Sequence, residues 1–327
     1  MTKENTKANT EIKISIEDAF ERLKKNVDII LSTSPLIVRE YTGYLAASTG
    51  KMIRAQALLT CALDKNNLVH PDGVSFGSAI EILHLATLVH DDVIDNSDLR
   101  RGKPSLQKKY GKRTAVICGD YLLCVALKAA ASVSDKNDYQ DRTLPDYMSK
   151  VCLGELGQHI NNGNYNLSVY RYLKIISGKT AALFEAAFHS GAIIMDKEVS
   201  HEVLREYSKL GRYLGMIFQL TDDCMDFETT ENVALKPVQS DFEQNVITLP
   251  LIHAFSKNVE LKESALKGTL TRKDLNRFVG STGGILYTRM MAKKYYDKGM
   301  SIIKTLDATD EKKVLLQDLL NKAYRVF

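Results

Sequence analysis

Two acidic clusters in this chain share the spacing D-D-x-x-D. They are Asp91, Asp92 and Asp95, and further along Asp222, Asp223 and Asp226. Residues four apart lie on one face of a helix, so the first and last carboxylates of each cluster would stack and repel each other. A hard divalent cation with oxygen ligands would relieve that repulsion. The spacing therefore predicts a metal site at each cluster.

Two arginines, Arg100 and Arg101, follow the first cluster closely. Guanidinium groups bind phosphate oxygens in pairs, so acids that hold metal beside these arginines describe a site for a diphosphate bridged by Mg2+. A single D-D-x-x-D could instead be a solvated helix end, since composition gives on the order of 0.1 chance matches. The second copy also ends an apolar run, which favours two walls around one metal cluster.

Both stretches resemble the trans-isoprenyl diphosphate synthases, the polyprenyl synthetase family. LVHDDVIDNSDLRRGKPS is similar to the first aspartate-rich motif of that family, and GMIFQLTDDCMDF to its F-Q-x-x-D-D-x-x-D. The resemblance runs from about Gly50 to Leu251. It implies an all-α fold, a single large helical bundle of the isoprenoid synthase type with a central apolar tunnel. Asn245-Val246 in place of Gly-Lys resembles the catalytic large subunit, component II, of long-chain heptaprenyl-type synthases.

The resemblance also implies a role for each residue at a matching position. Three Mg2+ ions per site would be held by the six aspartates when substrate is bound. Isopentenyl diphosphate would be bound by Lys51, Arg54, His84 and Arg101. The allylic diphosphate and the developing carbocation would be contacted by Arg100, Lys179, Thr180, Gln219 and Lys236. Lys179 and Gln219 would join the aspartates as catalytic residues.

Taken alone, some of these residues have other interpretations. Lys51 and Arg54 at a helix start could form an anion site or a solvated amphipathic face. Gly178-Lys179-Thr180 is not the end of a P-loop, because Leu173 stands where that motif needs glycine. Glycines of the loop after the second acidic motif are also replaced, as at Asn245, so we expect that loop to lose backbone freedom.

Helical spacing and capping signals predict the remaining organisation. Residues 1–13 are expected to form a flexible N-terminal tail, and residues 14–327 one polyprenyl synthetase domain. Ser15 and Asp18 predict a helix start, and Ser34-Pro35 an N-cap followed by proline at the first helical position. Further helices are expected at 74–95, 275–279, 286–303 and 311–324. No strand-like alternation of any length is present, which supports the all-α assignment.

Composition excludes several other classes of protein. The net charge of +4 does not suggest nucleic-acid binding. No unbroken run of about 18 apolar residues is present, so no transmembrane segment is expected, although product release could involve membrane contact. The polar N-terminus is not a signal peptide. Five cysteines without a C-x-x-C pair indicate reduced thiols and a cytoplasmic protein.

The implied reaction is a prenyl transfer that condenses isopentenyl diphosphate with an allylic diphosphate. Ala86 and Thr87 are small at positions where short-chain members of the family carry an aromatic, which predicts a chain of about C30 or longer, for quinones such as menaquinone. A farnesyl or geranylgeranyl synthase and a class I terpene cyclase are alternatives. The protein is expected to form a homodimer or a heterodimer with a small regulatory subunit, and it could be inactive without that partner.

Overall fold

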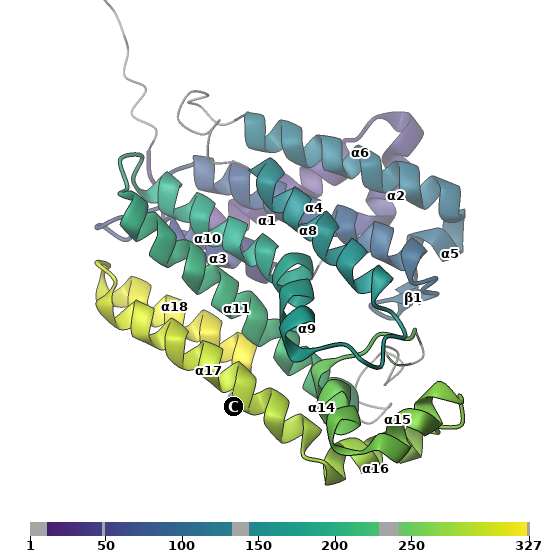
Figure 1. Cartoon of the computed structure of the whole chain (residues 1–327). Helices are drawn as coiled ribbons and strands as arrows, with labels where there is room; N and C mark the ends of the chain where they lie inside the picture. The colour runs from purple at the N-terminus through teal and green to yellow at the C-terminus, as the bar shows by residue number, and fades with distance from the viewer. Residues whose placement is uncertain (1–11, 48–49, 133–143, 229–241, 243, 326–327) are drawn as a thin grey trace, which may run out of the picture.

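The computed structural model describes residues 12–47, 50–132, 144–228, 242 and 244–325. Helices account for nearly all regular structure in these ranges, as the sequence predicts (Figure 1). The strands described are β1 (Leu99–Arg100) and β2 (Lys103–Pro104), which pair antiparallel as one small hairpin. The all-α assignment is therefore confirmed.

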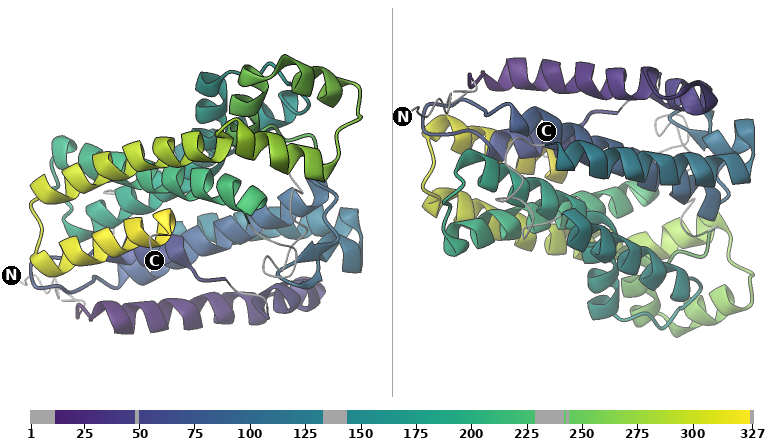
Figure 2. Two further views of the ribbon diagram at one scale, coloured as in Figure 1. Left: turned by 90° about the horizontal axis from the view of Figure 1, so that it is seen from below. Right: turned by 90° about the horizontal axis from the view of Figure 1, so that it is seen from above.

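The first helix, α1 (Ile16–Ser32), begins at the predicted cap, where the Ser15 hydroxyl accepts a hydrogen bond from the Asp18 backbone N–H. Its apolar residues recur every four positions and are buried; they are Ala19, Leu23, Val27 and Leu31. This stripe packs α1 along α4 at one edge of the bundle (Figure 2). Residues 12–14 are already held in place, since Ile14 pairs with Val69 through backbone hydrogen bonds.

The start of α2 (Leu36–Ala46) differs from the sequence prediction. Pro35 occupies the N-cap position rather than the first helical position, and Ser34 does not cap this helix. The Ser34 hydroxyl instead donates to the carbonyl oxygen of Ile30 at 3.0 Å. Because that bond satisfies a carbonyl near the end of α1, Ser34 closes one helix instead of opening the next.

The centre of the molecule is α4 (Asp72–Ile94), which matches the helix predicted at 74–95. It packs against α3 (Ile53–Cys61) and along the full length of α6 (Lys112–Ala131), with the hairpin and α5 (Leu106–Tyr110) between them in sequence. The first acidic motif lies at the C-terminal end of α4.

A second group of helices builds the opposite wall. It consists of α8 (Leu144–Ile160), α9 (Val169–Ile176), the π-helical segment η1 (Ser177–Ala181), α10 (Ala182–Met195) and α11 (His201–Glu228). The chain passes from α9 through η1 into α10 without leaving helical geometry. The 28-residue α11 packs on α10 and carries the second acidic motif near its C-terminal end.

The C-terminal part covers α11. Here α14 (Leu249–Lys257), α15 (Val259–Leu266) and α16 (Arg272–Ser281) form a compact group at one end, and α17 (Gly284–Thr305) and α18 (Asp310–Tyr324) return along the bundle (Figure 1). The three predicted C-terminal helices are confirmed as α16, α17 and α18. Apolar residues of α11, α17 and α18 form one core cluster, and those of α4, α6 and α10 contribute to another.

Two described helices, α4 and α6, are long and apolar enough to cross a membrane by length and composition, a test that buried core helices also pass. The most apolar window of α4 is 56% buried inside the protein, and that of α6 is 28% buried. Burial in the bundle explains the apolar character of α4. The α6 helix leaves part of its apolar surface exposed, including Ile117 at 56%.

Candidate active site

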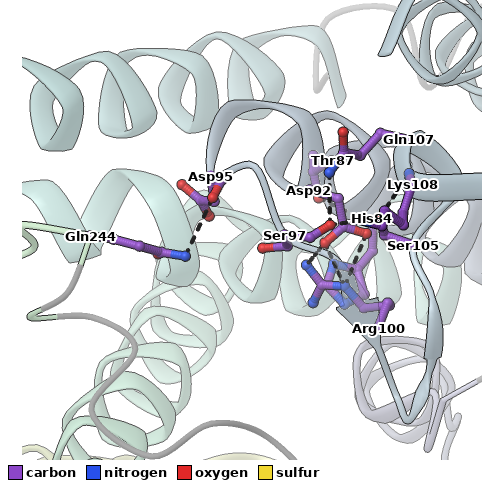
Figure 3. Close-up of polar contacts among 10 residues, drawn as sticks. All are labelled: His84, Thr87, Asp92, Asp95, Ser97, Arg100, Ser105, Gln107, Lys108 and Gln244. Atoms are coloured by element: carbon purple, nitrogen blue, oxygen red, sulfur yellow. Dashed lines mark hydrogen bonds and ion pairs between the residues drawn. The ribbon is translucent and has the colours of Figure 1, made fainter. Parts of the chain in front are cut away.

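The first acidic motif splits into two kinds of carboxylate. Asp92 is buried and accepts hydrogen bonds from the Arg100 guanidinium, with Nε 3.0 Å from Oδ1 and 3.2 Å from Oδ2 (Figure 3). Asp91 and Asp95 are half-buried and lie one helical turn apart. The second aspartate of this motif is therefore bound to an arginine, while the first and third remain on the site side.

The carboxylate of Asp91 is affected mainly by burial and has both acidic and basic neighbours, Lys179 and Arg100 among them. Burial, followed by the charges of Glu155 and Asp95, raises the pKa of Asp91 to about 7. Burial and Asp92 also raise the pKa of Asp95, against the opposing effect of Lys179 and Arg100. Both shifts mean that the ionised forms of Asp91 and Asp95 are disfavoured here. Added positive charge nearby would stabilise the ionised carboxylates.

Lys179 extends toward these acids from η1. Burial disfavours its ammonium, but the carboxylates of Glu155 and Asp91 outweigh burial and raise the pKa of Lys179. Its Nζ lies 2.9 Å from Oε2 of Glu155 on α8. The close approach of η1 to α8 requires glycine, since a Cβ on Gly154 would collide with the backbone of Lys179. A π-helical insertion at such a position is typical of functional sites.

The second acidic motif repeats the same division. Asp223 is buried and accepts hydrogen bonds from the Tyr172 hydroxyl and, at 2.8 Å, from Nε2 of Gln219. Oε1 of Gln219 in turn accepts a hydrogen bond of 2.7 Å from the Thr180 hydroxyl. Gln219 is thus fixed between η1 and its own helix, with its amide oxygen directed at Thr180.

The first aspartate of the second motif, Asp222, is 49% exposed at the side chain and pairs with Arg325, whose Nη2 lies 3.0 Å from Oδ1. Asp226 is half-buried. Among the described residues, no three His, Cys, Asp or Glu side chains are gathered closely enough to hold a metal ion. Three of the six predicted ligands, Asp92, Asp222 and Asp223, each contact a protein side chain here.

Both motifs nevertheless line one small cavity. Its volume is about 110 Å3, and its walls include Asp95, Lys179, Gln219 and Asp223. On one side it is closed by the segment 244–248, and Gln244 Nε2 approaches the Asp95 carbonyl oxygen at 3.5 Å (Figure 3). The two acidic helix ends therefore face a common space, as the sequence predicts.

That closing segment keeps a turn at one of the replaced glycines. Asn245, which replaces a glycine of the family motif, adopts a left-handed conformation with φ of 60°. Asparagine tolerates this region better than most residues, so the turn that glycine would permit is kept. Its carbonyl oxygen accepts a 2.7 Å hydrogen bond from the Gly163 N–H. Val246 lines the cavity itself, where the family motif has lysine.

A basic cluster lies about two helical turns before Asp91 on α4, around His84, which is on the same face of the helix as Asp91. Arg54 donates from Nη1 to Nε2 of His84 at 3.1 Å, and its guanidinium lies over the ring of Phe184. Burial lowers the pKa of Arg54 to about 10, although the nearby Glu81 opposes this shift. Burial and three arginines, Arg54 first, lower the pKa of His84 well below its ordinary value. The imidazole is therefore neutral and carries its proton on Nδ1.

Lys51 and Arg54 do not share a helix face as predicted. Lys51 precedes α3 and is exposed, whereas Arg54 lies in its first turn and is half-buried. Met52 between them takes a left-handed conformation that separates the two side chains. Lys51 lines a large cavity of about 1470 Å3 bounded by α1, α11 and α18, together with Gly50 and Arg325.

Arg101 joins this cluster from the hairpin. It forms a two-residue turn with Gly102, both with positive φ, between the paired strands. Its guanidinium packs against Gly50, where any Cβ would collide with it. The structure thus brings together Arg54, His84 and Arg101, with Lys51 at the edge. Lys236 lies outside the described residues.

The sequence analysis missed several residues that shape the site. They are Glu81, Glu155, Tyr172, Gln244 and Arg325. Glu81 accepts a hydrogen bond from the Ala55 N–H at 3.1 Å, and its carboxylate interacts electrostatically with the Arg54 guanidinium. Its place three residues before His84 on α4 was a usable signal, because i and i+3 share a face. Arg325 is an isolated charge near the C-terminus, and nothing in the local pattern distinguishes it.

The residues present fit Mg2+ by donor chemistry. Carboxylate oxygens are the ligands this ion prefers, and Asp95 and Asp223, one from each acidic motif, line the same small cavity. Asp91, Asp95, Asp222 and Asp226 would hold it, while Asp92 and Asp223 orient the two helix ends through Arg100 and Gln219.

An all-α bundle whose two acidic helix ends face one cavity, with a basic cluster beside it, is the arrangement of the isoprenoid synthases. The chain belongs to the polyprenyl synthetase family, whose sequence profile matches residues 35–278. It is a prenyltransferase of the trans-prenyl diphosphate synthase type.

The names of the relatives refer to prenyl products of different chain length. The chain is 32% identical to heptaprenyl diphosphate synthase component 2 of Geobacillus stearothermophilus, over 84% of this chain and 86% of that protein. The crystal structure of heptaprenyl diphosphate synthase from Staphylococcus aureus superposes with a TM-score of 0.86 at 29% identity, covering 96% and 99%. Geranylgeranyl pyrophosphate synthetase from Pyrococcus horikoshii gives 0.85 at 26%, covering 95% and 97%.

Proposed function

We propose that this enzyme makes a long-chain, all-trans polyprenyl diphosphate of about C30 or more by repeated addition of isopentenyl diphosphate. The product chain length is inferred from one observation. The residues about one turn before Asp91 on α4 are Ala86, which is fully buried, and Thr87. The Thr87 hydroxyl is turned back to the His84 carbonyl oxygen at 2.8 Å. Neither side chain is large enough to close a path along α4.

The allylic diphosphate belongs, in this proposal, at the cavity between the two acidic motifs. Mg2+ held there would stabilise the charge on the diphosphate leaving group. Lys179 supplies a positive charge from η1, and Arg100 holds Asp92 in place behind the site. The hydrogen bond between Thr180 and Gln219 holds both side chains in place, on the side of the cavity where the carbocation would develop.

Isopentenyl diphosphate belongs at the basic cluster about two turns before Asp91 along α4. Arg54 is well suited to a diphosphate, because its buried Nε has no hydrogen-bond partner among the described residues. Lys51 and Arg101 add charge from two different segments. The Glu81 carboxylate lies beside Arg54 and Arg101, and the neutral His84 adds no charge to the cluster.

The growing chain needs dry surroundings, since water would quench a carbocation. Along its proposed path, Leu83 and Ala86 of α4 lie buried in one core cluster with Cys118 and Leu122 of α6. These apolar side chains are packed together here, so a lengthening product would have to displace them or slide along them.

We further propose that the enzyme works as a dimer, with itself or with a smaller subunit. The α8 helix leaves a row of apolar side chains exposed at helical spacing; they are Leu153 at 68%, Leu156 at 52% and Ile160 at 66%. Such a row is typical of a helix that packs against a partner. The relative named component 2 supports a heteromeric partner.

The purified chain, incubated with farnesyl diphosphate, labelled isopentenyl diphosphate and Mg2+, tests the proposal directly. Mass spectrometry of the products should show chains of about C30 or longer. A product series that stops at C15 or C20 would instead identify a short-chain synthase, and unconsumed isopentenyl diphosphate with a cyclised product would identify a terpene cyclase. Activity that appears only with a second subunit would identify a heteromeric enzyme.

The chemistry of a long polyprenyl chain suits the side chain of a quinone, and we propose this use for the product. A cytoplasmic location is consistent with the five cysteines, all of which are free thiols in this structure.

A further inference from the structure

A basic side chain from the far end of the sequence reaches the second acidic motif. Arg325 follows the last residue of α18 and takes a left-handed conformation, with its N–H bonded to the Asn321 carbonyl oxygen. Its Nη2 contacts Asp222 at 3.0 Å. The other terminal nitrogen, Nη1, is buried and has no hydrogen-bond partner among the described residues. The guanidinium thus contacts Asp222 through Nη2, while Nη1 makes no hydrogen bond to the described residues.

This contact occupies the position where the proposed function needs a metal ligand. A guanidinium and a divalent cation both seek the oxygens of Asp222, and two cations so close together repel each other. The cap fixes the backbone of Arg325, but its side chain lines the 1470 Å3 cavity and has room there to turn away. Inside that cavity it would join Lys51 and Lys322.

We propose that Arg325 is the resident counter-ion of Asp222. It neutralises this carboxylate in the metal-free protein, has to release it when a divalent cation binds, and so lowers the affinity of the second acidic motif for the cation. The released guanidinium adds positive charge to the cavity, so binding of a cation at Asp222 and of an anion in the cavity favour each other. The inference rests on the metal site of the proposed function.

Direct Mn2+ binding, measured by electron paramagnetic resonance on the full chain without substrate, tests this inference. We expect Arg325→Gln to tighten Mn2+ binding by about 2- to 5-fold, the range of a part-exposed ion pair. The matched control is Lys322→Gln, which removes the same charge from the same cavity but has no contact with Asp222 among the described residues. Lys322→Gln should change the Mn2+ affinity less than Arg325→Gln does.

A double-mutant cycle makes the test specific to this pair. In an Asp222→Asn background, Arg325→Gln should have no further effect on Mn2+ affinity. Equal affinities of the wild type and Arg325→Gln would overturn the inference and leave the proposed function standing, as would an equal gain in Lys322→Gln. A wild-type protein that binds no Mn2+ would overturn the metal site itself. Thermal unfolding in EDTA checks that each variant is folded.

Discussion

Lys179 and Glu155 form an ion pair of 2.9 Å between η1 and α8, directly beside the first acidic motif. Their side chains are 22% and 23% exposed, so water screens the pair only in part. The lysine that the proposed function assigns to the allylic diphosphate is therefore already engaged by a carboxylate. A diphosphate has to compete with Glu155 for the ammonium group.

The first prediction follows from this competition. Glu155→Gln should lower the KM for the allylic diphosphate by about 2- to 5-fold, because the ion pair no longer opposes anion binding. The KM for isopentenyl diphosphate should stay unchanged. Steady-state kinetics with each substrate varied measures both values. Glu185→Gln is the control, since Glu185 pairs with Lys150 instead. A higher allylic KM in Glu155→Gln would contradict the prediction.

The second prediction separates the two kinds of aspartate. Asp91→Asn should raise thermal stability in EDTA, because burial and Glu155 disfavour the ionised carboxylate. Asp92→Asn should lower it, because Arg100 loses its charged partner. Both should reduce Mg2+-dependent turnover, Asp91→Asn by about three orders of magnitude or more. Equal stability of the two variants would show that the carboxylates share one environment.

The sequence predicted the positions of α4, α16, α17 and α18 well, because apolar spacing and caps are local signals. It could not separate Asp91 from Asp92, since adjacent helical residues differ only in which neighbouring element they face. That direction is set by Arg100 from the hairpin for Asp92, and by Tyr172 from α9 for Asp223. Arg325 was missed for the same reason: its partner lies 103 residues away in sequence.

The third prediction concerns the basic cluster. Arg54→Ala and Lys51→Ala should both raise the KM for isopentenyl diphosphate more than that for the allylic substrate. Only Arg54→Ala should also destabilise the fold, by about 1–3 kcal/mol, because it removes the hydrogen-bond donor to His84 and the largest opposing charge beside buried Glu81. Steady-state kinetics measures the KM for each substrate, and chemical unfolding measures the stability of each variant. Equal effects on both substrates would argue against the assignment, and so would a large loss of stability in Lys51→Ala.

The fourth prediction concerns a buried lysine outside the active site. Lys312 is 1% exposed and donates to the carbonyl oxygens of Cys61 and Leu63 at 2.6 and 2.9 Å. Burial lowers the pKa of Lys312 to about 8. A pKa that is lower in the folded than in the unfolded protein adds stability as pH rises between these two values.

Relative to Lys312→Met, the wild type should therefore gain about 1–2 kcal/mol of unfolding free energy between pH 7.5 and 9.5. Urea unfolding at both pH values measures the difference, and comparison with the variant cancels other groups that titrate in this range. Lys313→Met serves as the control, because this neighbouring lysine is only half-buried. A constant difference between wild type and Lys312→Met across this range would refute the prediction.

The last prediction tests the path of the product along α4. Ala86 is fully buried beside α6, one turn before the first acidic motif, so a phenylalanine there would project into the proposed tunnel. Overpacking should cost about 1–3 kcal/mol of stability. Products of Ala86→Phe, and more so of Ala86→Phe with Thr87→Phe, should shorten to C15–C20 while turnover is largely kept. Mass spectrometry of the products measures the change.

Leu88→Phe is the control for Ala86→Phe, because Leu88 lines the small cavity that contains Arg101 on the isopentenyl diphosphate side. It should leave product length unchanged even if it raises the KM for that substrate. If the double variant makes the same products as the wild type, the chain does not grow past Ala86, and another helix must form the wall that sets its length. The face of α6 that packs on α4 would then be the candidate for that wall.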